Sequence, residues 1–233
     1  MATTTFGVNT NDSANAATYV STAFTPAAGD LLVVFVSASG TTAIGSMTDS
    51  QGGSSWVTAI IRRLYNTNGS SLYCFVRTSS VAASSMTVTF DCTGDNATGA
   101  NQHVIRIAGM SKFGSAAVLQ TASEENQASG TTPAPVFGAS ALTGNVTLGA
   151  IGAQGAAPLC TPPTNWTELQ DTSYTVPNNG LETVNRDSGF TGTTITWGST
   201  VGAAWASLTV ELDTTAAADR VPYSSPYPQL LAH

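Results

Sequence analysis

The chain has 233 residues, of which 42% are hydrophobic and only 9% are charged, against roughly 25% in an ordinary soluble domain. The hydrophobic content excludes a disordered chain, and the net charge of -7 opposes a phosphate backbone, so we expect no nucleic-acid partner. The longest apolar run, LLVVFV, is far shorter than the ~18–20 residues of a membrane helix, so we expect no membrane partner.

Short β-branched and aromatic runs alternate along the chain with Gly, Asn, Ser, Asp and Pro, and no segment has helical periodicity. In MTVTF, for example, Met86, Val88 and Phe90 would face one side of a strand and the threonines the other. The pattern predicts an all-β fold, a two-sheet antiparallel β-sandwich. The predicted strands are residues 17–24, 30–38, 56–65, 71–77, 86–91, 102–108, 116–122, 146–153, 166–172, 181–186, 193–198 and 204–212.

The second half of the chain repeats landmarks of the first half in the same order. GDLLVVFVSASG corresponds to GNVTLGAIGAQG, SSWVTAI around Trp56 to TNWTELQ around Trp166, and YNTNGSSLYCFVR to YTVPNNGLETVNR. Chance similarity between strands is the alternative to duplication. The order of the matches favours one β-sandwich domain over residues 1–213, built from related halves at about 17–109 and 144–213, over two independent domains.

Residues 214–233 form a Pro/Tyr-rich tail of different composition. Its prolines exclude regular strand or helix and favour extended chain. A disordered terminus is the alternative to a docked segment. As assembly contacts on a neighbouring subunit we predict Pro222, Tyr223, Pro226, Tyr227, Pro228, Leu230 and Leu231.

Residue types that carry catalysis are scarce. His103 lies in a strand pattern, where we expect a structural role, and His233 is the last residue. Glycoside hydrolysis needs two converging carboxylates. In two candidate pairs the spacing along a strand points the side chains to opposite faces, and the third ends the last strand, where we expect solvated charges. We therefore expect no catalytic residue, no cofactor and no enzymatic activity from the pairs Glu124 with Glu125, Glu168 with Asp171, and Glu211 with Asp213.

The three cysteines cannot all pair, and Cys74, within SLYCFV, is expected to be a small core residue. A disulfide between Cys92 and Cys160 stays open as an alternative. The loop DCTGDNATGAN, from Asp91 to Asn101, is oxygen-rich like a calcium loop but lacks EF-hand spacing. Its residues also form plain turns, so we assign no metal ligand there, and metal binding stays an alternative.

Four tryptophans complete the candidates. We expect Trp197 and Trp205, which lie within alternating strands, to be core residues. Trp56 and Trp166 follow loops at matching places in the two halves, and this equivalence favours a shared packing role. The alternative is that both rings face a ligand, since sugar-binding surfaces use exposed aromatic rings.

The chain begins MATTTFGVNTNDSANAATYV, without the basic and apolar regions of a secretion signal, although its composition is that of an exported surface protein. We therefore expect synthesis in a host cytoplasm, which suits unpaired cysteines, and release by another route, such as assembly into a virus particle.

FTPAAGDLLVVFVSASG, SMTDSQGGSSWVTAI, the Tyr-containing strand that ends in Arg, and SSMTVTF together resemble a sandwich domain of bacteriophage virion structural proteins and uncharacterised bacterial surface proteins. The resemblance covers residues 17–213 and implies a jelly-roll-like fold without enzymatic residues. It implies a virion structural protein, such as a capsid decoration protein, that forms homo-oligomers and contacts capsid or tail proteins. The alternative function is a carbohydrate-binding or adhesin module, with glycans as partners.

Overall fold

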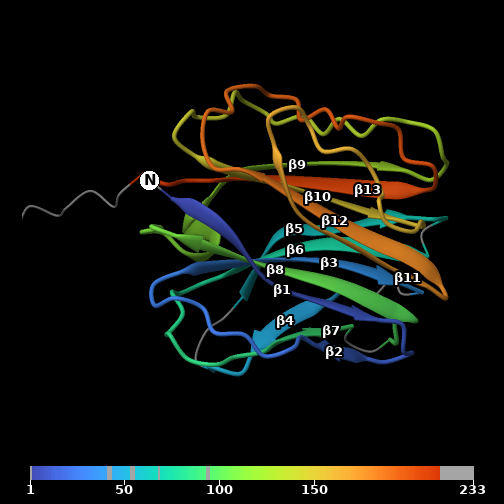
Figure 1. The fold of residues 1–233 in the computed structure, drawn as a ribbon, viewed down its shortest axis with the longest axis horizontal. Helices are drawn as coiled ribbons and strands as arrows, with labels where there is room; N and C mark the ends of the chain where they lie inside the picture. The colour runs from blue at the N-terminus through green and yellow to red at the C-terminus, as the bar shows by residue number, and fades with distance from the viewer. Residues whose placement is uncertain (1, 41–43, 53–55, 68, 93–94, 216–233) are drawn as a thin grey trace, which may run out of the picture.

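The computed structural model describes residues 2–40, 44–52, 56–67, 69–92 and 95–215 and confirms the predicted all-β class (Figure 1). No helix in these ranges has the length and apolar character that a membrane crossing requires. Besides one helical turn, η1 (Gly114–Ala116), the described elements are β1 (Thr3–Asp12), β2 (Thr18–Val20), β3 (Leu31–Ser39), β4 (Ser46–Asp49), β5 (Trp56–Tyr65), β6 (Ser70–Arg77), β7 (Val88–Asp91), β8 (Gly99–Ala108), β9 (Val118–Asn126), β10 (Val146–Ala153), β11 (Thr167–Thr175), β12 (Asn178–Arg186) and β13 (Trp205–Leu212).

The strands form three antiparallel sheets that lie in layers. The central sheet has the order β1-β8-β3-β6-β5, the upper sheet β11-β12-β10-β13-β9, and the small sheet β2-β7-β4. Figure 1 shows the upper sheet packed on one side of the central sheet and the small sheet on the other. The central sheet therefore has both of its faces covered by other strands.

Strand β3 explains why the central sheet is covered twice. All nine of its residues are buried. Leu31, Val33 and Phe35 face the core shared with the upper sheet, while Leu32 and Val34 face the core shared with the small sheet. A continuous apolar run is typical of a strand that is buried on both faces.

The expectation of two sheets is therefore wrong in number, because a doubly buried strand needs a layer on each side. The coarser prediction of stacked antiparallel sheets is confirmed. The third sheet is made of short strands, and its β7 contributes Phe90 to an aromatic group with Tyr73 and Phe75. The Phe90 centroid lies 5.1 Å from that of Tyr73 and 6.2 Å from that of Phe75.

The two large sheets have the same order of strands. When each element of the first half is matched to the one in the same place in the second, β1-β8-β3-β6-β5 becomes β9-β13-β10-β12-β11. Two of the predicted landmark pairs lie at corresponding strand ends. Trp56 begins β5 and Trp166 directly precedes β11, while Arg77 ends β6 and Arg186 ends β12.

An outer cover, defined as residues 131–142, 158–166 and 190–201, lies on the other face of the upper sheet. It buries Trp197 and, with β13, Trp205, so both predicted core tryptophans are confirmed. The prediction of a strand at 193–198 is wrong, since this segment forms only an isolated β-bridge, between Thr194 and Val136. Ile195 N–H donates to Pro135 O at 3.1 Å and Trp197 N–H to Pro133 O at 3.0 Å, but a proline has no N–H to return.

Two strands lie where none was expected, and both have weak sequence patterns. The residues of β1 are all partly buried or exposed, so its sequence lacks the alternation of apolar and polar residues that indicates a strand. Its register with β8 also shifts between Phe6 and Val8. β4 has only four residues. By contrast, β5 and β10 have the predicted bounds, because their apolar runs end at turn residues.

A buried polar network joins the central and upper sheets. The Tyr65 hydroxyl donates to Asn179 Oδ1 at 2.6 Å and lies 2.7 Å from Ser37 Oγ, and Asn179 Nδ2 donates to Ser37 Oγ at 2.8 Å. Tyr174 Oη lies 2.7 Å from Ser39 Oγ in the same network. Burial raises the pKa of the Tyr65 phenol. Because these partners come from both halves, the network fixes how the two large sheets align.

The three thiols are buried and unpaired. Cys74 lies in the core between the large sheets, as predicted, and burial raises its pKa. Cys92 lies in the core under the small sheet, and Cys160, within the outer cover, lies in the core between the cover and the upper sheet. The alternative of a Cys92–Cys160 disulfide is therefore not realised, because the two residues belong to separate cores.

Candidate binding site at Trp166 and Arg186

Acidic side chains on the outer face of the upper sheet hold the outer cover in place. Loop N–H groups that face the protein need acceptors once they lose water, and four carboxylates supply them. The bonds run from Ala134 N to Glu124 Oε2 (2.6 Å), Leu142 N to Glu211 Oε1 (2.8 Å), Leu159 N to Asp171 Oδ2 (3.0 Å) and Cys160 N to Glu182 Oε2 (2.9 Å).

Two expectations about these acids are wrong. Glu168 and Asp171 share a face, because the register of β11 against β12 shifts between Glu168 and Gln170 and reverses the alternation. Glu211 is fully buried rather than solvated, and it also accepts bonds from Gln120 and Asn145. Asp213 forms an ion pair with Lys112, whose hydrogen bond lowers the pKa of that carboxyl.

The carboxylates of the remaining pair, Glu124 and Glu125, do not converge on one partner. Glu124 and Glu125 are adjacent on β9, and Glu125 forms a half-exposed ion pair with Arg63 at 3.6 Å while Glu124 binds the outer cover. The two carboxylates thus serve different partners. None of the three predicted acid pairs lines a hollow described below.

Asp171 and Glu182 form a cross-strand pair that the sequence did not indicate. Burial raises the pKa of Glu182 to about 8, with a further contribution from the charge of Asp171, and burial raises the pKa of Asp171 to about 6. Like charges directly opposite each other destabilise a sheet. The pair therefore retains a proton near neutral pH. The sequence does not indicate the role of Glu182, because its partner Asp171 is set by the pairing of β11 with β12.

His103 has the structural role that its strand pattern predicts. It is fully buried between the large sheets, with Nδ1 at 3.0 Å from Thr183 Oγ1 and Nε2 at 2.7 Å from Thr172 Oγ1. Burial lowers its pKa to about 3, so the ring is neutral in the folded protein near neutral pH.

Two other predicted features lie partly or wholly outside the described ranges. The seven predicted assembly residues, from Pro222 to Leu231, and His233 all belong to 216–233, which the structure does not describe. The loop from Asp91 to Asn101 is described except at 93–94. Within the described residues no cluster of three or more His, Cys, Asp or Glu side chains could hold a metal ion.

Trp56 lies in a closed polar arrangement with Asp49 and Arg77. The indole Nε1 donates to Asp49 Oδ2 at 3.0 Å, and Arg77 donates to the same carboxylate through Nε at 2.9 Å and Nη2 at 3.4 Å. Arg77 Nη1 donates to the carbonyls of Ser79 and Ser80. The Arg77 and Asp49 side chains are 2% and 1% exposed, so this ion pair is buried.

Trp166 lies at the matching place in the upper sheet, but its surroundings are open. Its partly exposed ring packs edge-on against Phe190 at a centroid distance of 5.6 Å. The Arg186 guanidinium carbon lies 6.0 Å from the centroid of the same Phe190 ring. Arg186 donates to the carbonyls of Ser188 and Gly189 through Nε at 3.2 Å and Nη2 at 2.8 Å.

These side chains line a hollow of about 240 Å³ between the end of β12 and the outer cover. No acidic residue is among its described lining, and Arg186 has no ion-pair partner in the described part of the chain. The lining comprises Pro163, Thr164, Trp166, Arg186, Phe190, Thr194, Ile195 and Thr196. An aromatic ring with one convergent charged group is the composition of a small-molecule site. We call this hollow the Trp166 site.

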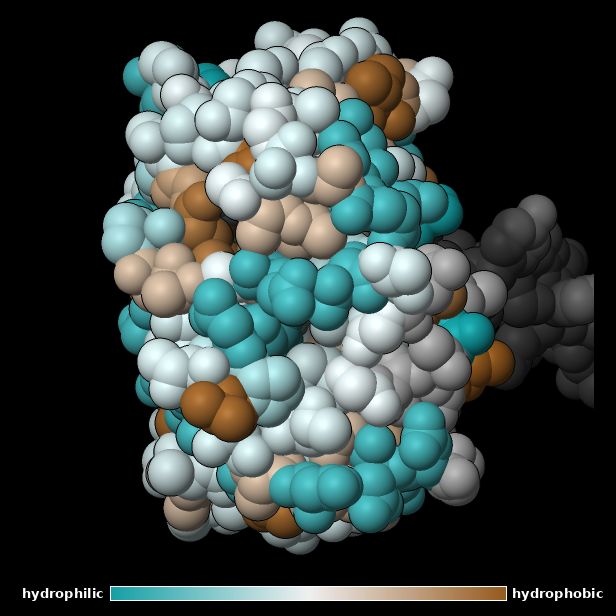
Figure 2. Space-filling model, turned by 90° about the vertical axis from the view of Figure 1, so that its right-hand side faces the viewer, coloured by the Kyte–Doolittle hydropathy of each residue, from teal (hydrophilic) through white to brown (hydrophobic). Residues whose placement is uncertain are grey.

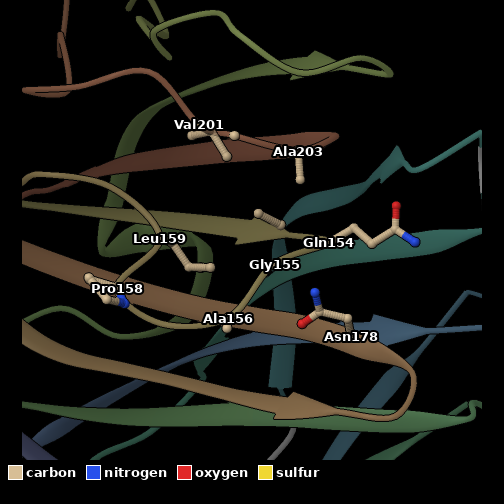
Figure 3. A pocket seen from close by; sticks show the side chains of 10 residues that line it. Gln154, Gly155, Ala156, Pro158, Leu159, Asn178, Val201 and Ala203 are labelled. Carbon is tan, nitrogen blue, oxygen red and sulfur yellow. The ribbon is translucent and has the colours of Figure 1, made fainter.

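A second hollow, of about 320 Å³, lies near the turn between β11 and β12 (Figure 3). Its described lining is mostly backbone and small side chains, with Gln154 and Asn178 as the polar side chains. It offers no charged group. Figure 2 shows one end of the molecule, where apolar residues form separate spots among polar ones rather than a continuous patch.

Of the predicted ligand-facing aromatics, the structure therefore distinguishes Trp56 from Trp166. Asp49 satisfies the indole N–H of Trp56, whereas Trp166 lines a hollow. Arg186 was not predicted as a site residue, although it ends the repeated YTVPNNGLETVNR landmark. That repeated landmark was the feature of the sequence that could have identified Arg186.

Comparison of the sequence with protein-family models gives no match. Comparison with curated proteins gives no match either.

Proposed function

We propose that this chain is a non-enzymatic structural component of a bacteriophage particle, most simply a capsid decoration protein at the particle surface. The observation that supports this most is that the buried ionisable side chains serve as hydrogen-bond partners within the fold. His103, Asp49, Asp171, Glu182 and Glu211 are all bound within the fold. The surface then relies on hydroxyl and amide groups, as suits a stable surface shell.

The proposed duplication agrees with this role. We infer that residues 17–109 and 144–213 are copies of one jelly-roll-like unit, and the support is the equal order of the four large-sheet strands within these bounds, β8-β3-β6-β5 and β13-β10-β12-β11. Each copy has its own small layer, which is the small sheet in the first half and residues 158–166 and 190–201 of the outer cover in the second. Packing the copies through their large sheets makes a rigid block suited to a repeated particle lattice.

The partners in this proposal are other copies of the chain and other virion proteins, and the tail is the proposed attachment. Deleting residues 219–233 should weaken binding to particles without unfolding the sandwich, since the described core ends at Leu212 in β13. Occupancy on purified particles would be compared for the full chain and the truncated chain, with thermal unfolding of both as control. Undiminished occupancy of the truncated protein would contradict the role of the tail.

A glycan-binding module is the second candidate, and the open Trp166 site favours it. A sugar ring could pack on the partly exposed indole, as aromatic rings do with apolar ring faces. Quenching of tryptophan fluorescence by glycans, lost in Trp166→Phe and kept in Trp56→Phe, would support this candidate. Equal loss in both variants would contradict the assignment to Trp166.

A further inference from the structure

The comparison of the two halves bears on what the Trp166 site binds. In the first half, a carboxylate lies between the indole and the arginine, where Asp49 accepts from Trp56 Nε1 and from Arg77 Nε and Nη2. Paired donors of this kind match the two oxygens of a carboxylate. The protein itself thus shows which chemical group fits between a tryptophan and an arginine at this place in the sheet.

In the second half, the corresponding carboxylate is missing. The hydrogen bond from Gly198 N to Thr161 O, at 2.8 Å, places residues near 161 beside the segment that corresponds to β7, as β4 lies beside β7 in the first half. Besides Pro163 and Trp166, this part of the outer cover contributes to the hollow only Thr164, a neutral hydroxyl. No described carboxylate takes the place of Asp49. The Nε and Nη2 donors that Arg77 directs at Asp49 are directed in Arg186 at the Ser188 and Gly189 carbonyls, so an added carboxylate would use the other edge of the guanidinium.

Arg186 therefore has unused donors. Its Nε and one Nη2 hydrogen bind the Ser188 and Gly189 carbonyls. A guanidinium has five N–H donors, so Nη1 and the second Nη2 hydrogen have no partner among the described residues. These two nitrogens form a fork that a carboxylate can accept from bidentately.

The net charge of -7 does not prevent an anion from binding here. Charges more than about 8 Å apart are largely screened at physiological ionic strength, so the local arginine dominates. The nearest acid in sequence, Asp187, accepts bonds from the Thr4 N–H and from Asn185 Nδ2. Among the described residues it forms no ion pair with Arg186.

We propose that the Trp166 site binds an acidic sugar, with its carboxylate on Arg186 and its ring against Trp166. This inference rests on the second candidate function, glycan binding. The volume of about 240 Å³ lies below the roughly 300–1,000 Å³ of sites for drug-sized ligands. The ligand is therefore a single ring, either free or at the end of a glycan.

The test is a titration of the full chain with glucuronate, glucose and acetate, followed by NMR at the Trp166 indole N–H. We expect glucuronate to bind at least about tenfold more tightly than either other probe, since charge-assisted hydrogen bonds contribute about 1.5–3 kcal/mol. Arg186→Gln should abolish this preference, and Arg186→Lys should retain part of it, because the charge remains but the fork is lost.

The matched control is Arg62→Gln on β5. Arg62 is another arginine without an ion-pair partner in the described ranges, and it lines a different hollow. The control should leave the glucuronate preference unchanged. Unaltered near-ultraviolet circular dichroism of each variant would show that the fold is retained.

The possible outcomes distinguish the preference for an acidic sugar from glycan binding itself. Equal binding of glucuronate and glucose would overturn the carboxylate preference while glycan binding stands. Acetate binding as tight as that of glucuronate would overturn the sugar assignment. Absence of binding by all three probes at tens of millimolar would overturn both.

Discussion

Asp49 is the residue on which the closed arrangement around Trp56 depends. Replacing it with Ala leaves the Arg77 charge buried without a partner, which costs about 3–5 kcal/mol for a buried ion pair. We expect Asp49→Ala to lower the free energy of unfolding by that amount in urea titrations. Glu125→Ala is the control, because its pair with Arg63 is 39–43% exposed and should cost at most about 1 kcal/mol. Similar losses in both variants would contradict this account.

Glu182 gives the protein a pH dependence with a defined sign. The folded-state pKa values of about 8 for Glu182 and about 6 for Asp171 exceed the ordinary values of 4.5 and 3.8. The folded state then binds more protons than the unfolded state, so this contribution to stability is complete below about pH 4 and is lost as the pH rises toward 8.

We therefore expect Glu182→Gln to stabilise the fold at pH 8.5 by about 1–3 kcal/mol relative to its effect at pH 5. The amide can still accept from Cys160 N–H and can donate to Asp171. His103, with its lowered pKa, contributes the opposite slope in acid, so variant and parent must be compared at each pH. If urea titrations show that the substitution changes the free energy of unfolding equally at both pH values, the Asp171–Glu182 pair does not retain a proton near neutral pH.

At the scale of elements, the outer cover depends on a few carboxylates rather than on a complete ladder. Glu211 accepts from Leu142 N–H, Asn145 and Gln120. We expect Glu211→Ala to increase amide hydrogen exchange at Leu142 at least about tenfold, since losing a buried acceptor costs about 1–3 kcal/mol. Exchange at Val34 in β3 should change much less. Unchanged protection at Leu142 would contradict the role of Glu211 as the anchor.

The elements also show how far sequence reasoning extends. Apolar runs with clear ends identified β5 and β10, but the prolines opposite 193–198, which have no N–H to donate, prevented a strand there. β1 was missed because it has no buried face that would impose alternation. The run LLVVFV already carried the signal of a doubly covered strand, which the expectation of two sheets overlooked.

The candidate site was predictable only in part, because it depends on pairing between distant strands. Trp166 was identified from its place in the repeat. The role proposed for Arg186 depends on a contact between distant strands of the other half, in which Asp49 binds both Trp56 and Arg77. No spacing along the chain shows that one half supplies a carboxylate and the other lacks it.

At the scale of the whole molecule, the two large sheets share one core and the Tyr65–Asn179 network. We expect a single unfolding transition in guanidinium chloride, seen at the same midpoint by tryptophan fluorescence and by far-ultraviolet circular dichroism. Two separated transitions would show that the halves fold as independent domains. They would contradict the single domain proposed for residues 1–213.

The central proposal concerns the place of this chain on a particle. The most direct measurement is the copy number of the protein in density-gradient-purified particles from cells that carry its gene, by quantitative mass spectrometry against the major shell protein. The account predicts a fixed, stoichiometric ratio that persists after high-salt washing. Detection only in the particle-free fraction would contradict it.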